Sequence, residues 1–92
     1  MTAKLNSTFK VELSHNLHRS YINRVEQEVI DYVDSNEQAI TEFWIKDDNN
    51  KTYSGAFEVV AKSKTTARSY VENVKQLLGQ MGRVTLETEE GE

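Results

Sequence analysis

The stretch Ala39–Ala61, AITEFWIKDDNNKTYSGAFEVVA, most constrains the fold, because it predicts two adjacent β-strands joined by a short polar turn. It contains Trp44, the only tryptophan of the chain. The turn sequence Asp-Asp-Asn-Asn-Lys at 47–51 is rich in residues that tolerate left-handed backbone conformations and cap their own backbone. We therefore predict a β-hairpin at the centre of the chain.

The segments on either side of this hairpin each predict one strand and one helix. The run TFKVELS from Thr8 alternates apolar and polar residues, which indicates a half-buried strand, and residues 1–7 are predicted to be frayed. From Leu17 the apolar residues repeat every four positions as far as Val33, which is typical of an amphipathic helix.

After the hairpin, Ser63 is a candidate N-cap for a second helix, and Gly79 and Gly82 mark its end. Its apolar stripe consists of Ala67, Val71, Val74 and Leu78. A short alternating strand follows at 83–87, and residues 88–92 are predicted to form an acidic tail.

The predicted element order is therefore β-α-β-β-α-β within one domain, residues 1–92. With right-handed crossovers, this order predicts an α+β, ferredoxin-like βαββαβ fold: a four-stranded antiparallel sheet, order 4-1-3-2, with both helices on one face.

Composition excludes several classes of protein. The 92 residues include no cysteine, so a disulfide, a thiol nucleophile and a cysteine-ligated metal are excluded. No apolar run reaches the roughly 18 residues that a membrane-spanning helix needs, and the N-terminus has no apolar signal sequence. We therefore expect a cytoplasmic protein with no membrane partner.

The net charge of −4 is unevenly distributed along the chain. Residues 26–48 carry eight acidic residues and one lysine, for a net charge of −7. The preceding residues have a net charge of +3, residues 49–86 have +4, and the tail from Glu87 has −4. Such blocks are most simply a solvated surface, although they also permit association between charged partners.

No pattern of residues predicts catalysis. His15 and His18 are three residues apart, but the spacing fixes no third ligand for a metal. Glu58 lies in the apolar run AFEVV, where its alternation with Phe57 and Val59 directs it to the outer face of the sheet. We therefore expect a protein that is not an enzyme and that uses neither a metal nor a cofactor.

The register of the hairpin decides which large side chains lie on the sheet face without helices. An odd number of loop residues places Phe43 and Ile45 inside and Trp44 outside, whereas an even number reverses this assignment. The odd register separates apolar from polar residues more cleanly, and we predict it. The residues then expected to bind a protein partner through this face are Ile40, Glu42, Trp44, Lys46 and Val60.

Two other binding functions remain open. Lys62, Lys64 and Arg68 lie at the predicted start of the second helix, where backbone N–H groups favour anions or nucleic acid. Alternatively, the acidic residues of positions 26–48, among them Glu28 and Asp31, could imitate nucleic acid on a partner's binding groove.

We favour a non-catalytic protein-interaction module, an inhibitor or adaptor of a larger protein that could also form a homodimer through the open sheet face. Small acidic proteins without cysteine resemble those that phages and mobile elements encode to block host machinery.

Overall fold

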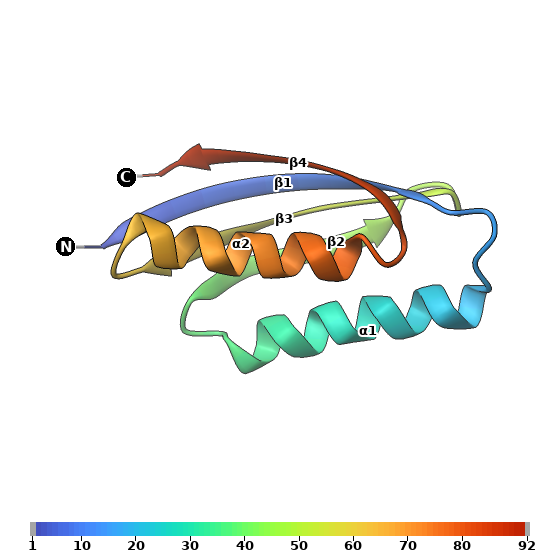
Figure 1. Ribbon diagram of the computed structural model, residues 1–92, viewed down its shortest axis with the longest axis horizontal. Coiled ribbons are helices and arrows are strands. Elements are labelled where there is room, and N and C mark those ends of the chain that lie inside the picture. The colour runs from blue at the N-terminus through green and yellow to red at the C-terminus, as the bar shows by residue number, and fades with distance from the viewer. Residues whose placement is uncertain (1, 92) are drawn as a thin grey trace.

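The computed structural model describes residues 2–91 as two helices packed on a four-stranded sheet (Figure 1). In chain order, the elements are β1 (Ala3–Leu13), α1 (Arg19–Ser35), β2 (Ile40–Asp47), β3 (Thr52–Ala61), α2 (Lys64–Leu78) and β4 (Gly82–Glu90). Both helices begin close to where their apolar periodicity starts, and the Ser63 hydroxyl accepts a hydrogen bond from the Thr66 N–H at 3.2 Å, as expected for an N-cap.

The sheet is antiparallel throughout and has the strand order β2-β3-β1-β4. This is the predicted order 4-1-3-2 read from the opposite edge, so the predicted α+β topology is confirmed. Figure 1 shows α1 and α2 on the same side of the sheet. Helix α2 packs against β1, β3 and β4, whereas α1 packs against α2 and the edge strand β2.

One continuous apolar core fills the space between the helices and the inner face of the sheet. The strands contribute alternate residues to it, because successive side chains of a strand point to opposite faces. The helices contribute one stripe each, with α1 supplying Ile22, Val25, Val29 and Val33.

The N-terminus departs from the prediction, because β1 begins at Ala3 and not at Thr8. Leu5 and Ser7 continue the inward alternation of Phe9, and both are only 2% exposed. The buried Ser7 hydroxyl is satisfied by a hydrogen bond with Thr88 Oγ1 at 3.0 Å. The prediction that residues 1–7 are frayed is therefore wrong for 3–7, since one inward-facing serine hides a continuous strand pattern; Met1 lies outside the described residues.

The C-terminus also departs from the prediction, because β1 is longer than expected and so gives β4 a longer partner. Strand β4 pairs with β1 as far as Leu5 opposite Glu90, and the Gly91 N–H donates to the Lys4 carbonyl at 2.8 Å. The expected acidic tail of 88–92 is thus strand at 88–90, and Glu92 lies outside the described residues.

The hairpin adopts the predicted odd register. Asp47 pairs with Tyr53, so five residues, 48–52, separate the paired positions. Phe43 and Ile45 consequently pack against the core, whereas Trp44 is the exposed large hydrophobic side chain, at 48%.

A β-bulge in β2 corrects the predicted position of Ile40. The ladder runs regularly from Asp47 back to Trp44 and then shifts before Thr41, so that Glu42 and Phe43 together oppose Phe57. Because one extra residue reverses the alternation, Ile40 points into the core and is 2% exposed. The sequence-based assignment of Ile40 to the outer face is therefore wrong.

Gly55 of β3 provides a test of this packing. An added Cβ at Gly55 would collide with the Trp44 carbonyl oxygen and with the Phe9 ring, both across the strand. We expect Gly55→Ala to destabilise the fold by about 1–3 kcal/mol, as overpacking does in a close-packed interior, measured by urea unfolding. Gly79→Ala is the matched control, because its Cβ would meet backbone oxygens only at 3.4 Å; an equal loss in both variants would contradict the packing at Gly55.

Candidate functional site

The outer face, meaning the sheet face opposite the two helices, is mainly polar and charged. Its residues are Lys4, Asn6, Thr8, Lys10 and Glu12 from β1, Thr41, Trp44 and Lys46 from β2, Thr52, Ser54, Ala56, Glu58 and Val60 from β3, and Arg83, Thr85, Glu87 and Glu89 from β4. Trp44 is therefore the exposed large apolar side chain on a mainly hydrophilic surface.

Trp44 lies on the outer face opposite a small cross-strand residue and beside a cation. It lies opposite Ala56, whose small side chain leaves the indole uncovered. The Lys46 Nζ lies 5.9 Å from the indole centroid, within range of a cation–π interaction. The same Nζ lies 3.9 Å from Asp48 Oδ1, so one exposed lysine contacts both the indole and the turn.

The five residues predicted to bind a partner do not form one surface. Trp44 and Lys46 lie together on the outer face, and Ile40 lies in the core. Val60 is on the outer face but four residues along β3 from Ala56, which corresponds to about 13 Å. The Lys4–Glu58 ion pair at 3.4 Å involves the outer-face residue between Ala56 and Val60.

Glu42, the remaining member of that set, lies at the bulge with a positive φ of 54°. It is exposed and borders a hollow between α1 and β2 rather than the outer face. The bulge thus divides the predicted site between two sides of the molecule.

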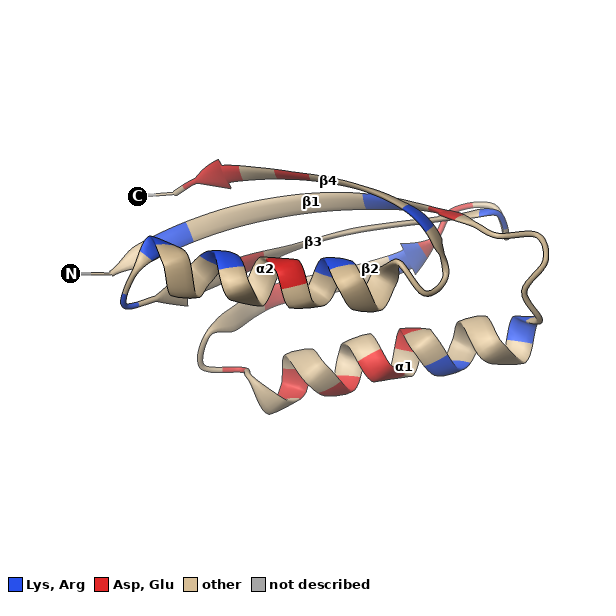
Figure 2. Ribbon diagram, viewed as in Figure 1, with Lys and Arg blue, Asp and Glu red and all other residues tan. Residues whose placement is uncertain are grey.

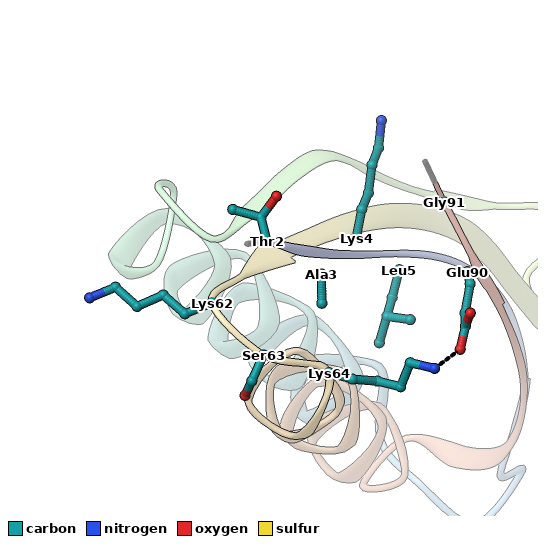
Figure 3. Close-up of a pocket in the computed structure, with 9 residues that line it drawn as sticks. All are labelled: Thr2, Ala3, Lys4, Leu5, Lys62, Ser63, Lys64, Glu90 and Gly91. Carbon is teal, nitrogen blue, oxygen red and sulfur yellow. Dashed lines mark ion pairs between the residues drawn. The ribbon is translucent and has the colours of Figure 1, made fainter.

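The predicted anion site at the start of α2 forms a shallow hollow whose lysines diverge. Figure 3 shows Lys62 pointing away from the hollow, while Lys64 extends toward Glu90. Lys64 and Glu90 form an ion pair, and this hydrogen bond holds the pKa of the Glu90 carboxyl below its usual value. The carboxylate therefore already occupies the position that a bound anion would take beside Lys64.

A polar network that the sequence did not reveal connects α1 to the hairpin. The buried Tyr53 hydroxyl donates to Glu26 Oε1 at 3.2 Å and accepts from Arg19 Nη2 at 2.9 Å. Arg19 Nη2 also donates to Asp47 Oδ2 at 2.8 Å. The only sequence signal was the inward alternation of Tyr53, because the other three residues look like ordinary surface charges.

The pKa shifts in this network have local causes. Burial raises the pKa of the Tyr53 phenol, and the nearby Glu26 carboxylate raises it further. A hydrogen bond from the Asn50 N–H, together with the Arg19 guanidinium, holds the pKa of Asp47 below its ordinary value. The hydrogen bond to Asp47 in turn raises the pKa of Arg19. These groups stabilise the junction of helix and turn.

The two histidines and the acidic segment are the other features that the sequence singled out. Among residues 2–91, no three His, Asp or Glu side chains are grouped as a metal site would require, and His15 and His18 are both exposed. Figure 2 shows the acidic residues gathered along the second half of α1. Asp47 and Asp48 do not extend this stripe, since they bind Arg19, Lys46 and Ser54 within the chain.

Comparison with known proteins identifies the fold. No family model matches the chain, and no curated protein sequence does so. Among solved structures, the chain resembles a putative antibiotic biosynthesis monooxygenase from Caulobacter crescentus, with a TM-score of 0.68 and 10% identity over 99% of this chain and 92% of that one. It also resembles the hydroxynitrile lyase of Passiflora edulis, with a TM-score of 0.62 and 7% identity over 97% and 94% of the two chains.

A third similar structure is a dimeric protein of unknown function and ferredoxin-like fold from Bacteroides fragilis, with a TM-score of 0.60 and 8% identity over 96% of both chains. At these identities, the likeness establishes the ferredoxin-like architecture alone. No helix among the described residues is long and apolar enough to cross a membrane.

The lowered pKa of Asp47 predicts how stability depends on pH. Because the folded-state pKa lies below the unfolded one, the contribution of Asp47 is complete above the unfolded value of about 3.9 and is lost as the pH falls through the folded value. We expect the urea midpoint of the wild type to fall more steeply below about pH 4 than that of Asp47→Asn. Asp34→Asn, which removes a carboxylate that has no ion pair among residues 2–91, should retain the wild-type slope; a wild-type slope in Asp47→Asn would refute the assignment.

Proposed function

We propose that the protein is a non-catalytic interaction module that binds a protein partner through the outer face, with Trp44 at the centre of contact. In this role it acts as an inhibitor or adaptor of a larger protein, in the manner of small phage or mobile-element proteins.

The exposure of Trp44 carries this proposal. The indole is 48% exposed on a face that is mainly polar, so its apolar surface is hydrated at a free-energy cost. Tryptophan is among the residues most enriched in binding hot spots. Polar residues typically form a rim around such a hot spot. The neighbouring Lys46, Thr41 and Ser54 would form such a rim.

Structural roles of the titratable groups support a non-catalytic module. Each shifted pKa belongs to a group bound to a partner in the folded chain: Arg19, Asp47 and Tyr53 in the network at the turn, and Glu90 in its pair with Lys64. The names of the two enzymes with a similar fold describe those proteins, and their identities of 10% and 7% do not carry chemistry to this chain.

Self-association through the same face is a second form of the proposal. The structure from Bacteroides fragilis is dimeric and has the same architecture. The outer face also carries both signs of charge, with Lys10 and Arg83 on one side and Glu87 and Glu89 on the other, so that a second copy could meet complementary charges.

The single tryptophan makes the proposal directly testable. We expect Trp44→Ala to weaken association by about 2 kcal/mol or more, roughly 30-fold in affinity, with little change in the urea midpoint. Thr85→Ala on β4 is the matched control on the same face.

Two measurements distinguish the forms of association. Self-association shifts the Trp44 emission to shorter wavelength as the protein concentration rises, and light scattering then gives a dimer mass. If the partner is a different protein, the free protein stays monomeric. A protein that the wild type and Thr85→Ala capture from host extract is then not captured by Trp44→Ala. Equal capture by all three proteins, with a monomeric mass, would remove Trp44 from the binding surface.

A further inference from the structure

A groove lies between the C-terminal half of α1 and the edge strand β2, on the helix side of the sheet. It has a volume of about 550 Å3. The apolar lining consists of Ile30, Val33, Ile40, Phe43 and Ile45, and the polar lining of Thr41, Asp34, Glu37 and Glu42. We call this feature the acidic groove.

The bulge of β2 creates the acidic groove. In a regular strand, Phe43 and Ile40 would point to opposite faces, because they are three residues apart. The bulge places Glu42 and Phe43 together against Phe57, so Ile40, Phe43 and Ile45 all line the same hollow. The groove is therefore built by the backbone irregularity and does not follow from the alternation of the sequence.

Glu42 adopts a strained backbone at the mouth of the groove. Its φ of 54° is in the left-handed region, which glutamate occupies at a steric cost. Strained residues of this kind concentrate at binding and functional sites, where the surrounding structure holds them in place. The bulge thus places an exposed carboxylate at the rim, beside the apolar floor.

The three carboxylates of the rim have no ion pair among residues 2–91. The ion pairs of the described chain are Lys4–Glu58, Arg19–Asp47, Lys46–Asp48 and Lys64–Glu90. Asp34, Glu37 and Glu42 are all exposed and border one apolar floor. Exposed acids such as Glu28, Asp31 and Glu72 also have no ion pair among these residues, but at the groove three unpaired carboxylates border one apolar floor.

We infer that the acidic groove binds a basic amphipathic helix of a partner protein. Apolar side chains of that helix enter the floor formed by Ile30, Phe43 and Ile45, and its Lys or Arg residues pair with Asp34, Glu37 and Glu42. The charge of the rim repels nucleic acid and anionic lipid. A helix fits better than an added β-strand, because the bulge interrupts the edge of β2 along which a strand would pair.

This site opens on the helix side of the sheet, and Thr41 of the edge strand borders both it and the outer face. Trp44 points away from the helices, whereas Phe43 and Ile45 on either side of it point into the groove. The two surfaces thus share one strand and can be tested independently.

A defined peptide tests the inference. The probe is a fluorescein-labelled peptide of Leu and Lys, about 18 residues or five helical turns long, with Leu on one face; its counterpart has Glu in place of Lys. We expect the basic peptide to bind the wild type with a rise in fluorescence anisotropy that decreases as salt is added. The acidic peptide should not bind.

Two triple variants of equal charge locate the binding site. Asp34→Asn, Glu37→Gln and Glu42→Gln together neutralise the rim, whereas Glu28→Gln, Asp31→Asn and Glu72→Gln neutralise exposed acids elsewhere. Each removes three negative charges, so the net charge changes from −4 to −1 in both. We expect the rim variant to lose about tenfold or more in affinity and the control about twofold or less. Equal losses would show attraction to net charge alone and would overturn the inference.

The apolar floor is tested separately. Ile30→Ala should weaken peptide binding by roughly fivefold, while Leu77→Ala, a half-buried leucine of α2 outside the groove, should not. Trp44→Ala should also leave peptide binding unchanged. A failure of this inference can therefore be distinguished from a failure of the proposed function at the outer face. If the rim variant instead changes the mass of the protein in light scattering, a second copy occupies the groove and the inference is wrong.

Discussion

Phe9, Phe43 and Phe57 pack against one another on the inner face of the sheet, and the placement of the two proposed binding surfaces depends on this contact. Their ring centroids are 6.1–6.2 Å apart, which is within the range of favourable aromatic pairs. The three rings come from β1, β2 and β3, so they fix the register of the edge strand against the two strands beside it. With Phe43 inside, the pleat of the strand directs Trp44 outward.

Strand β2 consequently presents a different surface on each side. On the outer face it exposes Trp44 beside Lys46, and on the helix side it forms the floor of the acidic groove with α1. The bulge allows both, because Ile40 and Phe43 can then lie inside together. An edge strand suits this role, since one of its sides has no neighbouring strand and its backbone can deviate at lower cost.

Near the starts of the two helices, charged side chains have partners within the chain. Arg19 and Glu26 of α1 bind Tyr53 and Asp47 and so attach the start of the helix to the hairpin turn. Glu90 neutralises Lys64 at the start of α2. Arg19 and Lys64, at the starts of the two helices, therefore have partners within the chain. The carboxylates along the second half of α1 and at the bulge are left without such partners among residues 2–91.

The sequence by itself determined the element order, the strand order and the register of the hairpin. These follow from local periodicity, from the turn at 47–51 and from the chirality of crossovers, all of which are visible in a single chain. It also determined that Trp44 is outside, because the odd register separated apolar from polar residues. The length of β1 was missed because the buried Ser7 looks polar, and its hydroxyl is satisfied only by Thr88, a residue 81 positions away.

Only the tertiary structure decided the position of Ile40, the network around Tyr53 and the acidic groove. A bulge adds one residue without changing composition or periodicity in a recognisable way, so no local pattern predicts that Ile40 turns inward. Likewise, Asp34, Glu37 and Glu42 are ordinary surface acids in the sequence. They become one rim only when α1 packs beside β2, because that contact joins residues from a helix, a loop and a strand.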